Sequence, residues 1–204
     1  MPPDYTVPET ENAERILREG WTLFQAKGYH GVAIDELCHR CGITKPTLYY
    51  YFHDKENLYV QVLMHRMRGF RAVIESGAPL PDRLYSVALT MIESFETGLM
   101  AMMRDVAHIQ NAGLRRFVEQ GFHAELLGPL TELARSGIDR GELAKGDPSF
   151  LAWAFLGLVS TFVTKERALG FDQPALAHRV VTLFLKGAGE PSAAPRARNQ
   201  RGRS

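Results

Sequence analysis

GVAIDELCHRCGITKPTLYYYFHDK, residues 31–55, is the stretch that decides the fold. Its first half places apolar side chains at Ile34, Leu37, Cys38 and Cys41, a spacing of three and four that is typical of a helix with one buried face. Gly42 supplies the left-handed backbone that ends a helix at little cost. We therefore expect a short helix that stops at Gly42.

The second half of the stretch predicts another short helix. Thr44 suits the N-cap, and Pro46 fits the first turn, where no backbone donor is lost. Leu48 and Phe52 are four residues apart and would face the core, whereas three consecutive tyrosines on so short a helix cannot all be buried. We interpret residues 31–55 as a helix-turn-helix that offers its second helix to a DNA major groove.

A wider set of residues, from the end of the preceding helix to the start of the next one, fits the same motif. These residues are Gly28, Tyr29, Ile34, Leu37, Cys41, Gly42, Ile43, Thr44, Lys45, Thr47, Leu48, Tyr49, Phe52, Lys55 and Leu58. With them, about the first quarter of the chain resembles the DNA-binding domain of the tetracycline-repressor (TetR) family of bacterial transcription regulators. The resemblance implies a dimeric, ligand-responsive DNA-binding regulator, most commonly a repressor released from a palindromic operator.

The sequence departs from the family pattern at the start of the first motif helix. Val32 and Ala33 stand where the family generally carries Ser or Thr, whose hydroxyl caps this helix and contacts a phosphate. Neither side chain can do so, and Asp35 would replace the cap only in part. Cys38 and Cys41 stand where Ala is common, and Tyr51 where His is common.

The expected DNA contacts lie on and around the second motif helix. They are Thr44, Lys45, Pro46, Thr47, Tyr49, Tyr50, Tyr51 and Lys55. Lys45 suits guanine O6 and N7, and the Pro46 ring suits a thymine methyl group. By family position, Tyr51 and Lys55 would hold phosphate. The alternative is that this helix is exposed and polar but binds nothing. The complete motif at the family spacing disfavours this alternative.

Charge alone does not suggest a nucleic-acid binder, because the 204-residue chain has a formal net charge of +1. The first 60 residues hold six Lys or Arg residues against nine Asp or Glu residues. Non-specific DNA affinity should therefore be weak, and binding should depend on a well-fitted dimer.

The sequence shows neither a membrane-spanning run nor a secretion signal, so we expect a cytoplasmic protein without a membrane partner.

The rest of the chain predicts an all-α protein of about nine helices, in which a helical bundle follows the three-helix DNA-binding domain. We expect a flexible arm over residues 1–9 and the DNA-binding domain over 10–54. A ligand-binding and dimerisation domain would cover 55–187, and a disordered basic tail 188–204. A helix from residue 55 to about 76 would connect the two domains as a lever.

Two late helices, from 149 to about 169 and from 174 to about 186, are apolar on more than one face. Such helices need cover on all sides, which the same two helices of a second copy would provide. The residues expected at this homodimer interface are Phe155, Val159, Phe162, Val181 and Phe184.

Methionine and aromatic residues concentrate in the middle helices, where they could line a pocket for an apolar small molecule. The candidates are Met91, Phe95, Met103, His108, Phe117 and Phe122, with His108 or His123 as a polar anchor. The pattern alone favours core packing, and the family resemblance raises the weight of a pocket. No motif in the sequence identifies the effector.

Catalytic and metal-binding signatures are missing from the sequence. Cys38 and Cys41 have the spacing of a metal or redox pair, but further ligands for zinc and a preceding strand are lacking, so buried packing is favoured over oxidation sensing. We expect no catalytic residues, no metal and no cofactor. Two alternatives stay open: a DNA-binding or adaptor protein without an inducer, and an enzyme that uses the bundle as a substrate pocket.

Overall fold

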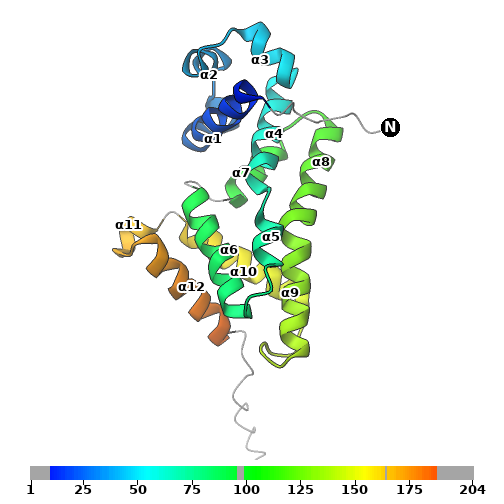
Figure 1. The fold of residues 1–204 in the computed structure, drawn as a ribbon, viewed down its shortest axis with the longest axis vertical. Helices are drawn as coiled ribbons and strands as arrows, with labels where there is room; N and C mark the ends of the chain where they lie inside the picture. The colour runs from blue at the N-terminus through cyan, green and yellow to red at the C-terminus, as the bar shows by residue number, and fades with distance from the viewer. Residues whose placement is uncertain (1–9, 96–98, 164, 188–204) are drawn as a thin grey trace, which may run out of the picture.

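The computed structural model describes residues 10–95, 99–163 and 165–187, and all secondary structure within these ranges is helical. The predicted all-α fold is thus confirmed (Figure 1). The expected arm, residues 1–9, and the expected tail, residues 188–204, lie outside the described residues.

The N-terminal part forms one end of the elongated molecule (Figure 1). It comprises α1 (Glu11–Gly31), α2 (Ile34–Cys41) and α3 (Lys45–Phe52), packed on the start of α4 (Lys55–Met67). α1 begins directly after Thr10, whose hydroxyl accepts a hydrogen bond from the backbone N–H of Ala13 at 3.2 Å and so caps the helix.

The helix expected from 55 to about 76 is broken, which corrects the prediction of one continuous lever. Gly69 has φ 98°, a left-handed conformation that an α-helix does not accommodate, and it separates α4 from the short α5 (Phe70–Ile74). The direct continuation of the DNA-binding end into the body is therefore α4 alone.

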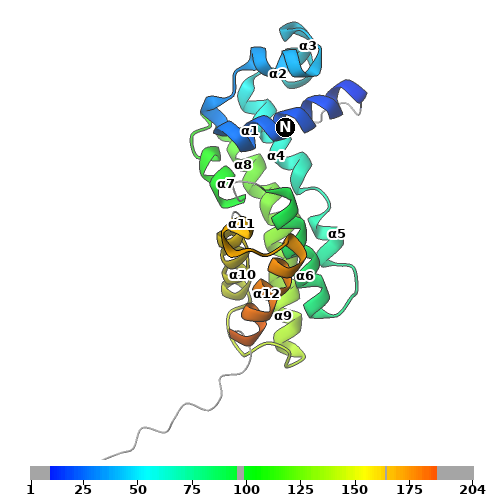
Figure 2. The same cartoon turned by 90° about the vertical axis from the view of Figure 1, so that its left-hand side faces the viewer.

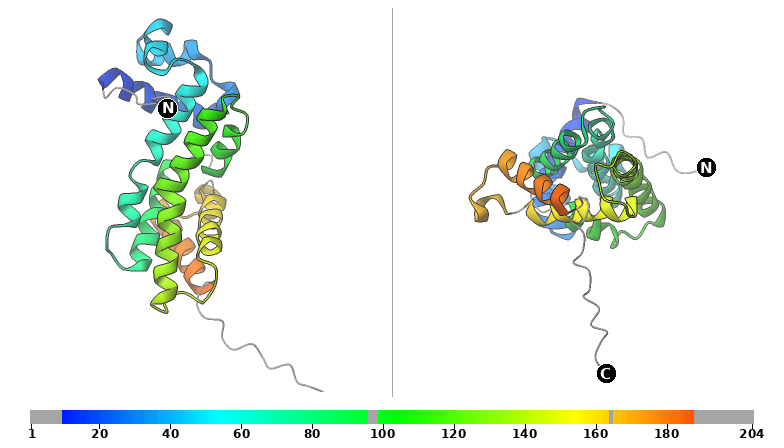
Figure 3. Two further views of the ribbon diagram at one scale, coloured as in Figure 1. Left: turned by 90° about the vertical axis from the view of Figure 1, so that its right-hand side faces the viewer. Right: turned by 90° about the horizontal axis from the view of Figure 1, so that it is seen from below.

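The body begins with α6 (Leu80–Ser94) and α7 (Leu99–Val106). α6 ends at Ser94, because the next residue, Phe95, has an extended backbone. A long column then runs the length of the body without a break, as Figure 3 shows. It consists of α8 (Ala112–Phe122), a π-helical turn η1 (His123–Leu127) and α9 (Gly128–Asp139).

The last helices are α10 (Pro148–Phe162), α11 (Glu166–Leu169) and α12 (Gln173–Gly187). The helix expected from 149 to about 169 thus ends at Phe162. α12 packs on α6 and on α10, and α10 also packs on α9. Figure 2 shows α10, α11 and α12 together on one side of the molecule.

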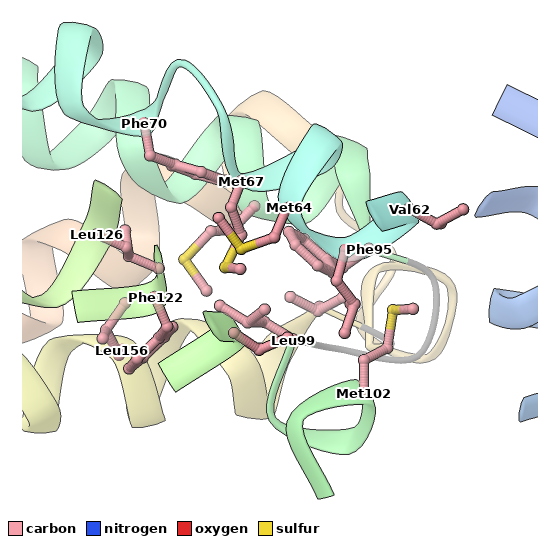
Figure 4. Packing of buried hydrophobic residues seen from close by; sticks show 14 of the residues in the cluster. Val62, Met64, Met67, Phe70, Phe95, Leu99, Met102, Phe122, Leu126 and Leu156 are labelled. Atoms are coloured by element: carbon pink, nitrogen blue, oxygen red, sulfur yellow. The ribbon is translucent and has the colours of Figure 1, made fainter. Parts of the chain in front are cut away.

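One hydrophobic cluster runs from the DNA-binding end into the body. Met64 and Met67 of α4 meet Phe95, Phe122 and Leu126 in its centre (Figure 4). Burying each such side chain stabilises the fold by about 1.5–3 kcal/mol, so α4 is anchored in both parts of the molecule. Among the described residues, no helix combines the length and apolarity that crossing a membrane demands.

Candidate DNA interface and ligand-binding hollows

The turn between α2 and α3 has the geometry expected of a helix-turn-helix. Gly42 adopts φ 61° and ψ 35°, and the N–H of Ile43 donates to the Cys38 carbonyl at 3.0 Å, which closes α2. The Thr44 hydroxyl caps α3 by accepting from the N–H of Thr47 at 3.4 Å. Ala33, at the start of α2, provides no side-chain cap, as the sequence predicts.

The two faces of α3 differ sharply. Leu48 and Phe52 are completely buried, whereas Tyr50 is 76% exposed and Tyr49 39% exposed. Tyr51 is half-buried, with its ring 5.3 Å from that of Tyr50. The other expected contact residues of the helix start, Thr44, Lys45 and Pro46, are exposed, and Thr47 is half-buried. α3 therefore presents a polar and aromatic face outside the core.

Lys45 and Lys55 are both engaged within the protein. The Lys45 ammonium lies 2.9 Å from Asp35 Oδ1, and this hydrogen bond and the carboxylate charge raise the pKa of Lys45. Lys55 Nζ donates to the His30 carbonyl at 3.5 Å and lies 4.9 Å from the centre of the Tyr29 ring. Burial lowers the pKa of Lys55. A phosphate contact by Lys55 would compete with these partners.

A two-residue connection fixes α3 to α4. His53 has φ 60° and ψ −52°, and the N–H of Asp54 donates to the Phe52 carbonyl at 2.6 Å, which makes a tight γ-turn. Asp54 then caps α4 by accepting from the N–H of Asn57 at 2.7 Å. A movement of α4 would accordingly carry α3 with it.

Asp105 of α7 joins the body to the DNA-binding end. Its Oδ2 accepts from the backbone N–H of Tyr29 at 3.1 Å and from the Tyr59 hydroxyl at 3.5 Å. The Tyr59 hydroxyl also donates to the Met102 carbonyl at 3.0 Å, and burial raises the pKa of Tyr59. Gly28 has φ 67° and ψ 173°, which turns the Tyr29 N–H out of the α1 helix towards Asp105.

Glu56 of α4 makes a second link between the two parts. Its carboxylate accepts from the backbone N–H groups of Gln110 and Asn111, at 2.6 and 3.1 Å, just before α8 begins. Sequence reasoning missed both links, because each joins segments more than 40 residues apart and neither forms a motif.

An apolar hollow of about 300 Å³ opens beside η1. Two of the expected pocket residues, Met103 and Phe122, line it together with Trp153 and Leu127. The Trp153 ring, which sequence reasoning did not place here, lies 5.7 Å from that of Phe122.

The other expected pocket residues lie elsewhere. Met91 and Phe95 are fully buried in the core and do not line this hollow. Phe117 is half-buried and packs against the core. His108 is exposed, and its ring lies 5.9 Å from that of His30, so it does not anchor a ligand here.

The residues expected at the dimer interface are mostly interior. Phe155, Val159, Val181 and Phe184 are at most 7% exposed within the single chain, because α6 and α9 cover the inner sides of α10 and α12. Phe162 is half-buried. The first four positions therefore offer a partner little apolar surface, and their place at a dimer interface stays a prediction.

The outer faces of α10 and α12 carry a different apolar set. It includes Phe150 at 69% exposed, Trp153 at 47% and Leu183 at 55%. Exposed Ala154 and Gly157 continue the α10 stripe from Phe150 at spacings of four and three residues.

Cys38 and Cys41 are free thiols buried in the domain core, and burial raises the pKa of both. Both thiols therefore remain protonated near neutral pH, which disfavours oxidation sensing. Within the ranges that the structure covers, His, Cys, Asp and Glu side chains form no group of three or more suited to a metal ion.

Comparisons with known proteins agree with this architecture. The family model described as "Bacterial regulatory proteins, tetR family" matches residues 16–62. The uncharacterized HTH-type transcriptional regulator YdgC of Bacillus subtilis (strain 168) is 27% identical over 191 residues, which cover 87% of this chain and 92% of YdgC. The HTH-type transcriptional activator FasR of Mycolicibacterium smegmatis is 34% identical over 94 residues, which cover 44% of this chain and 43% of FasR.

Solved structures share the fold over most of the chain. PfmR of Thermus thermophilus, a TetR family transcriptional regulator, superposes with a TM-score of 0.69 at 21% identity and covers 84% of this chain and 97% of its own. AibR, solved with isovaleryl coenzyme A and operator DNA, gives 0.67 at 21% identity, covering 85% and 97%. FadR of Bacillus subtilis, solved with stearoyl-CoA, gives 0.64 at 21% identity, covering 85% and 98%. The helix-turn-helix part of the chain therefore matches the tetR family of bacterial regulatory proteins, and the chain as a whole shares the fold of TetR-family regulators of known structure.

Proposed function

We propose that the protein is a homodimeric repressor that binds a palindromic operator through α3 and leaves it when a small, largely apolar molecule binds the body. The observation that carries this proposal is the division of α3. Its buried Leu48 and Phe52 fix the helix, while exposed Tyr49 and Tyr50 and the helix start are free to meet base edges and phosphates.

Dimerisation would bring two copies of α3 to successive major grooves. Half-sites one DNA turn apart, about 34–36 Å, require two recognition helices at that spacing. We assign the interface to the outer faces of α10 and α12, where Phe150, Gly157 and Leu183 are exposed. Gly157 has open space around it, so a partner helix could approach closely.

The effector would enter the apolar hollow beside η1. Met103 and Phe122, which line it, belong to α7 and α8, and these helices hold Asp105 and lie beside Asn111. Ligand-dependent movement there would reach α1 and α4 through the Asp105 and Glu56 links. A ligand releases the protein from DNA only to the extent that it binds the DNA-free conformation more tightly than the DNA-bound conformation.

Selection of bound genomic DNA fragments tests the DNA-binding part. We expect a palindromic site, and gel shifts with that site should show a complex of two subunits. Isovaleryl-CoA and stearoyl-CoA are suitable first effector probes, because structurally similar regulators were solved with them. Release of the operator by a probe supports a ligand-responsive repressor.

One observation favours a second candidate, a DNA-binding protein without an inducer. Met91 and Phe95, which could have walled a ligand site, fill the interior instead. A discriminating variant is Trp153→Ala, which enlarges the remaining hollow. If ligand panels leave operator affinity unchanged for both the wild type and this variant, the second candidate is preferred.

A further inference from the structure

A cavity of about 470 Å³ adjoins the apolar hollow at η1 and is lined by residues of α5, α6, η1, α9 and the first turn of α10. The two hollows share His123 and Leu127. The cavity volume falls within the range of about 300–1,000 Å³ that is usual for small-molecule sites. Its lining is more polar than that of the apolar hollow, because Arg71 and Arg83 both contribute to it.

Two arginines and two glutamates line the cavity, but only one of these arginines is paired with a carboxylate of the lining. Arg71 is paired with Glu75 at 3.0 Å, and Glu132 is paired with Arg135 at 3.4 Å. Arg83 forms no ion pair with any carboxylate of the described residues. The cavity therefore contains one cation whose charge the protein does not neutralise by direct contact.

The hydrogen bonds of Arg83 are also incomplete. Its Nη1 donates to the carbonyl of Ile74, the last residue of α5, at 3.2 Å. Its Nε is shielded from water and has no acceptor in the structure. A guanidinium edge with an unused donor matches a group with two acceptor oxygens. Because Nε is shielded, the Arg83 side chain must rotate for this edge to face a ligand in the cavity.

Apolar side chains complete the lining. Ile74 and Leu133 in this lining are already buried, whereas Leu127 is half-buried and Ala124 is exposed, so the last two offer apolar surface to a ligand. A ligand that satisfies Arg83 while covering these side chains needs an anionic head and a short hydrocarbon part. A fully polar anion would leave the apolar wall uncovered, and an uncharged apolar molecule would leave Arg83 without a partner.

We infer that this cavity is a binding site for a small organic carboxylate, whose oxygens accept from Arg83 and whose hydrocarbon chain lies against Ala124 and Leu127. The site is distinct from the apolar hollow to which the effector is assigned, and binding to it does not require DNA. The carboxylate site can therefore be disproved without disproving the proposed function, and the reverse also holds.

Isothermal titration of the full-length protein without DNA tests the site, with hexanoate, hexanamide and acetate as probes. Hexanoate should bind, and hexanamide, which has the same shape without the charge, should bind about tenfold more weakly or worse. Acetate should also bind more weakly, because it lacks the hydrocarbon chain. Equal affinity for hexanoate and hexanamide, or no binding of hexanoate at ~10 mM, would overturn the inference.

Two variants locate the binding. Arg83→Gln should reduce hexanoate affinity about tenfold. Because this change also removes the contact to the Ile74 carbonyl, Ser149→Asp provides an independent test. Ser149 is exposed, lines the cavity and lies in the first turn of α10, where an acidic residue is favourable, so the fold should be retained.

The new carboxylate of Ser149→Asp should repel hexanoate and reduce its affinity by a similar factor. Arg116→Gln, an exposed position on α8 outside the cavity, is the matched control and should bind hexanoate as the wild type does. Wild-type affinity in a folded Ser149→Asp variant would contradict the assignment.

Discussion

The Lys45 ammonium and the Asp35 carboxylate lie 2.9 Å apart and tie the first turn of α3 to the first turn of α2. Both side chains are well exposed, so the pair is accessible to DNA. A guanine or a phosphate that takes Lys45 must displace Asp35, and Asp35 itself repels the phosphate backbone. In the proposed interface this pair weakens binding to any DNA.

Asp35→Asn should therefore tighten operator binding roughly threefold at low salt, because it frees Lys45 and removes a negative charge. The dependence of affinity on salt should become steeper. Fluorescence anisotropy with a labelled operator at several salt concentrations measures both effects. Asp139→Asn, at the far end of α9, is the control. Weaker binding by Asp35→Asn would show that the carboxylate supports the interface instead.

The assignment of the dimer interface predicts the effect of charges on the outer faces of α10 and α12. Gly157→Glu and Leu183→Glu should each shift the protein towards monomers, since both positions are exposed in the single chain and a pair of facing carboxylates would repel. Light scattering measures the change, and circular dichroism should show an unchanged fold. Ala72→Glu on α5 serves as the control. An intact dimer in both α10 and α12 variants would place the interface elsewhere.

Asp105 should contribute to stability through the Tyr29 and Tyr59 contacts. Asp105→Ala leaves the N–H of Tyr29 without its acceptor and should lower the free energy of unfolding by about 1–3 kcal/mol. Asp105→Asn keeps an acceptor oxygen and should cost less. Urea denaturation measures both values, with Asp139→Ala as a control. If Asp105→Ala unfolds like the wild type, the junction does not depend on this carboxylate.

A close contact between α4 and α8 gives a further prediction. A Cβ atom at Gly121 would overlap the end of the Met64 side chain. Gly121→Ala should therefore displace the flexible end of Met64, and because Ala also favours the helix, the net cost should be at most about 1 kcal/mol of stability. In a Met64→Ala background the same change should cost less, which a double-mutant cycle detects.

Gly146→Ala is the matched control for that cycle, because nothing lies within 4 Å of the Cβ it would add. Equal costs of Gly121→Ala in the two backgrounds would mean that α4 and α8 are not in contact at this point.

Local structure could be predicted well from the sequence. The end of α2 at Gly42 and the Thr44 cap of α3 depend on residues within a few positions of one another. The burial of Leu48 and Phe52 follows from their four-residue spacing. Such features need no knowledge of the rest of the chain.

Tertiary features could not be predicted in the same way. α10 carries apolar side chains on several of its faces. The sequence therefore shows that the helix is covered but not which side its own subunit covers. Val159 faces inward and Gly157 outward because α6, α9 and α12 occupy one side. The apolar spacing of α4 continues through Phe70 and conceals the break that Gly69 introduces. The Asp105 and Glu56 links join distant segments and leave no local pattern.

Operator binding by variants of α3 tests the central claim most directly. Tyr49→Ala and Lys45→Ala should each weaken binding to the selected operator about tenfold or more while retaining the wild-type melting temperature. Lys145→Ala, an exposed lysine in the loop before α10, should bind as the wild type does. Unchanged operator affinity in both folded α3 variants would contradict the assignment of α3 as the DNA-reading helix.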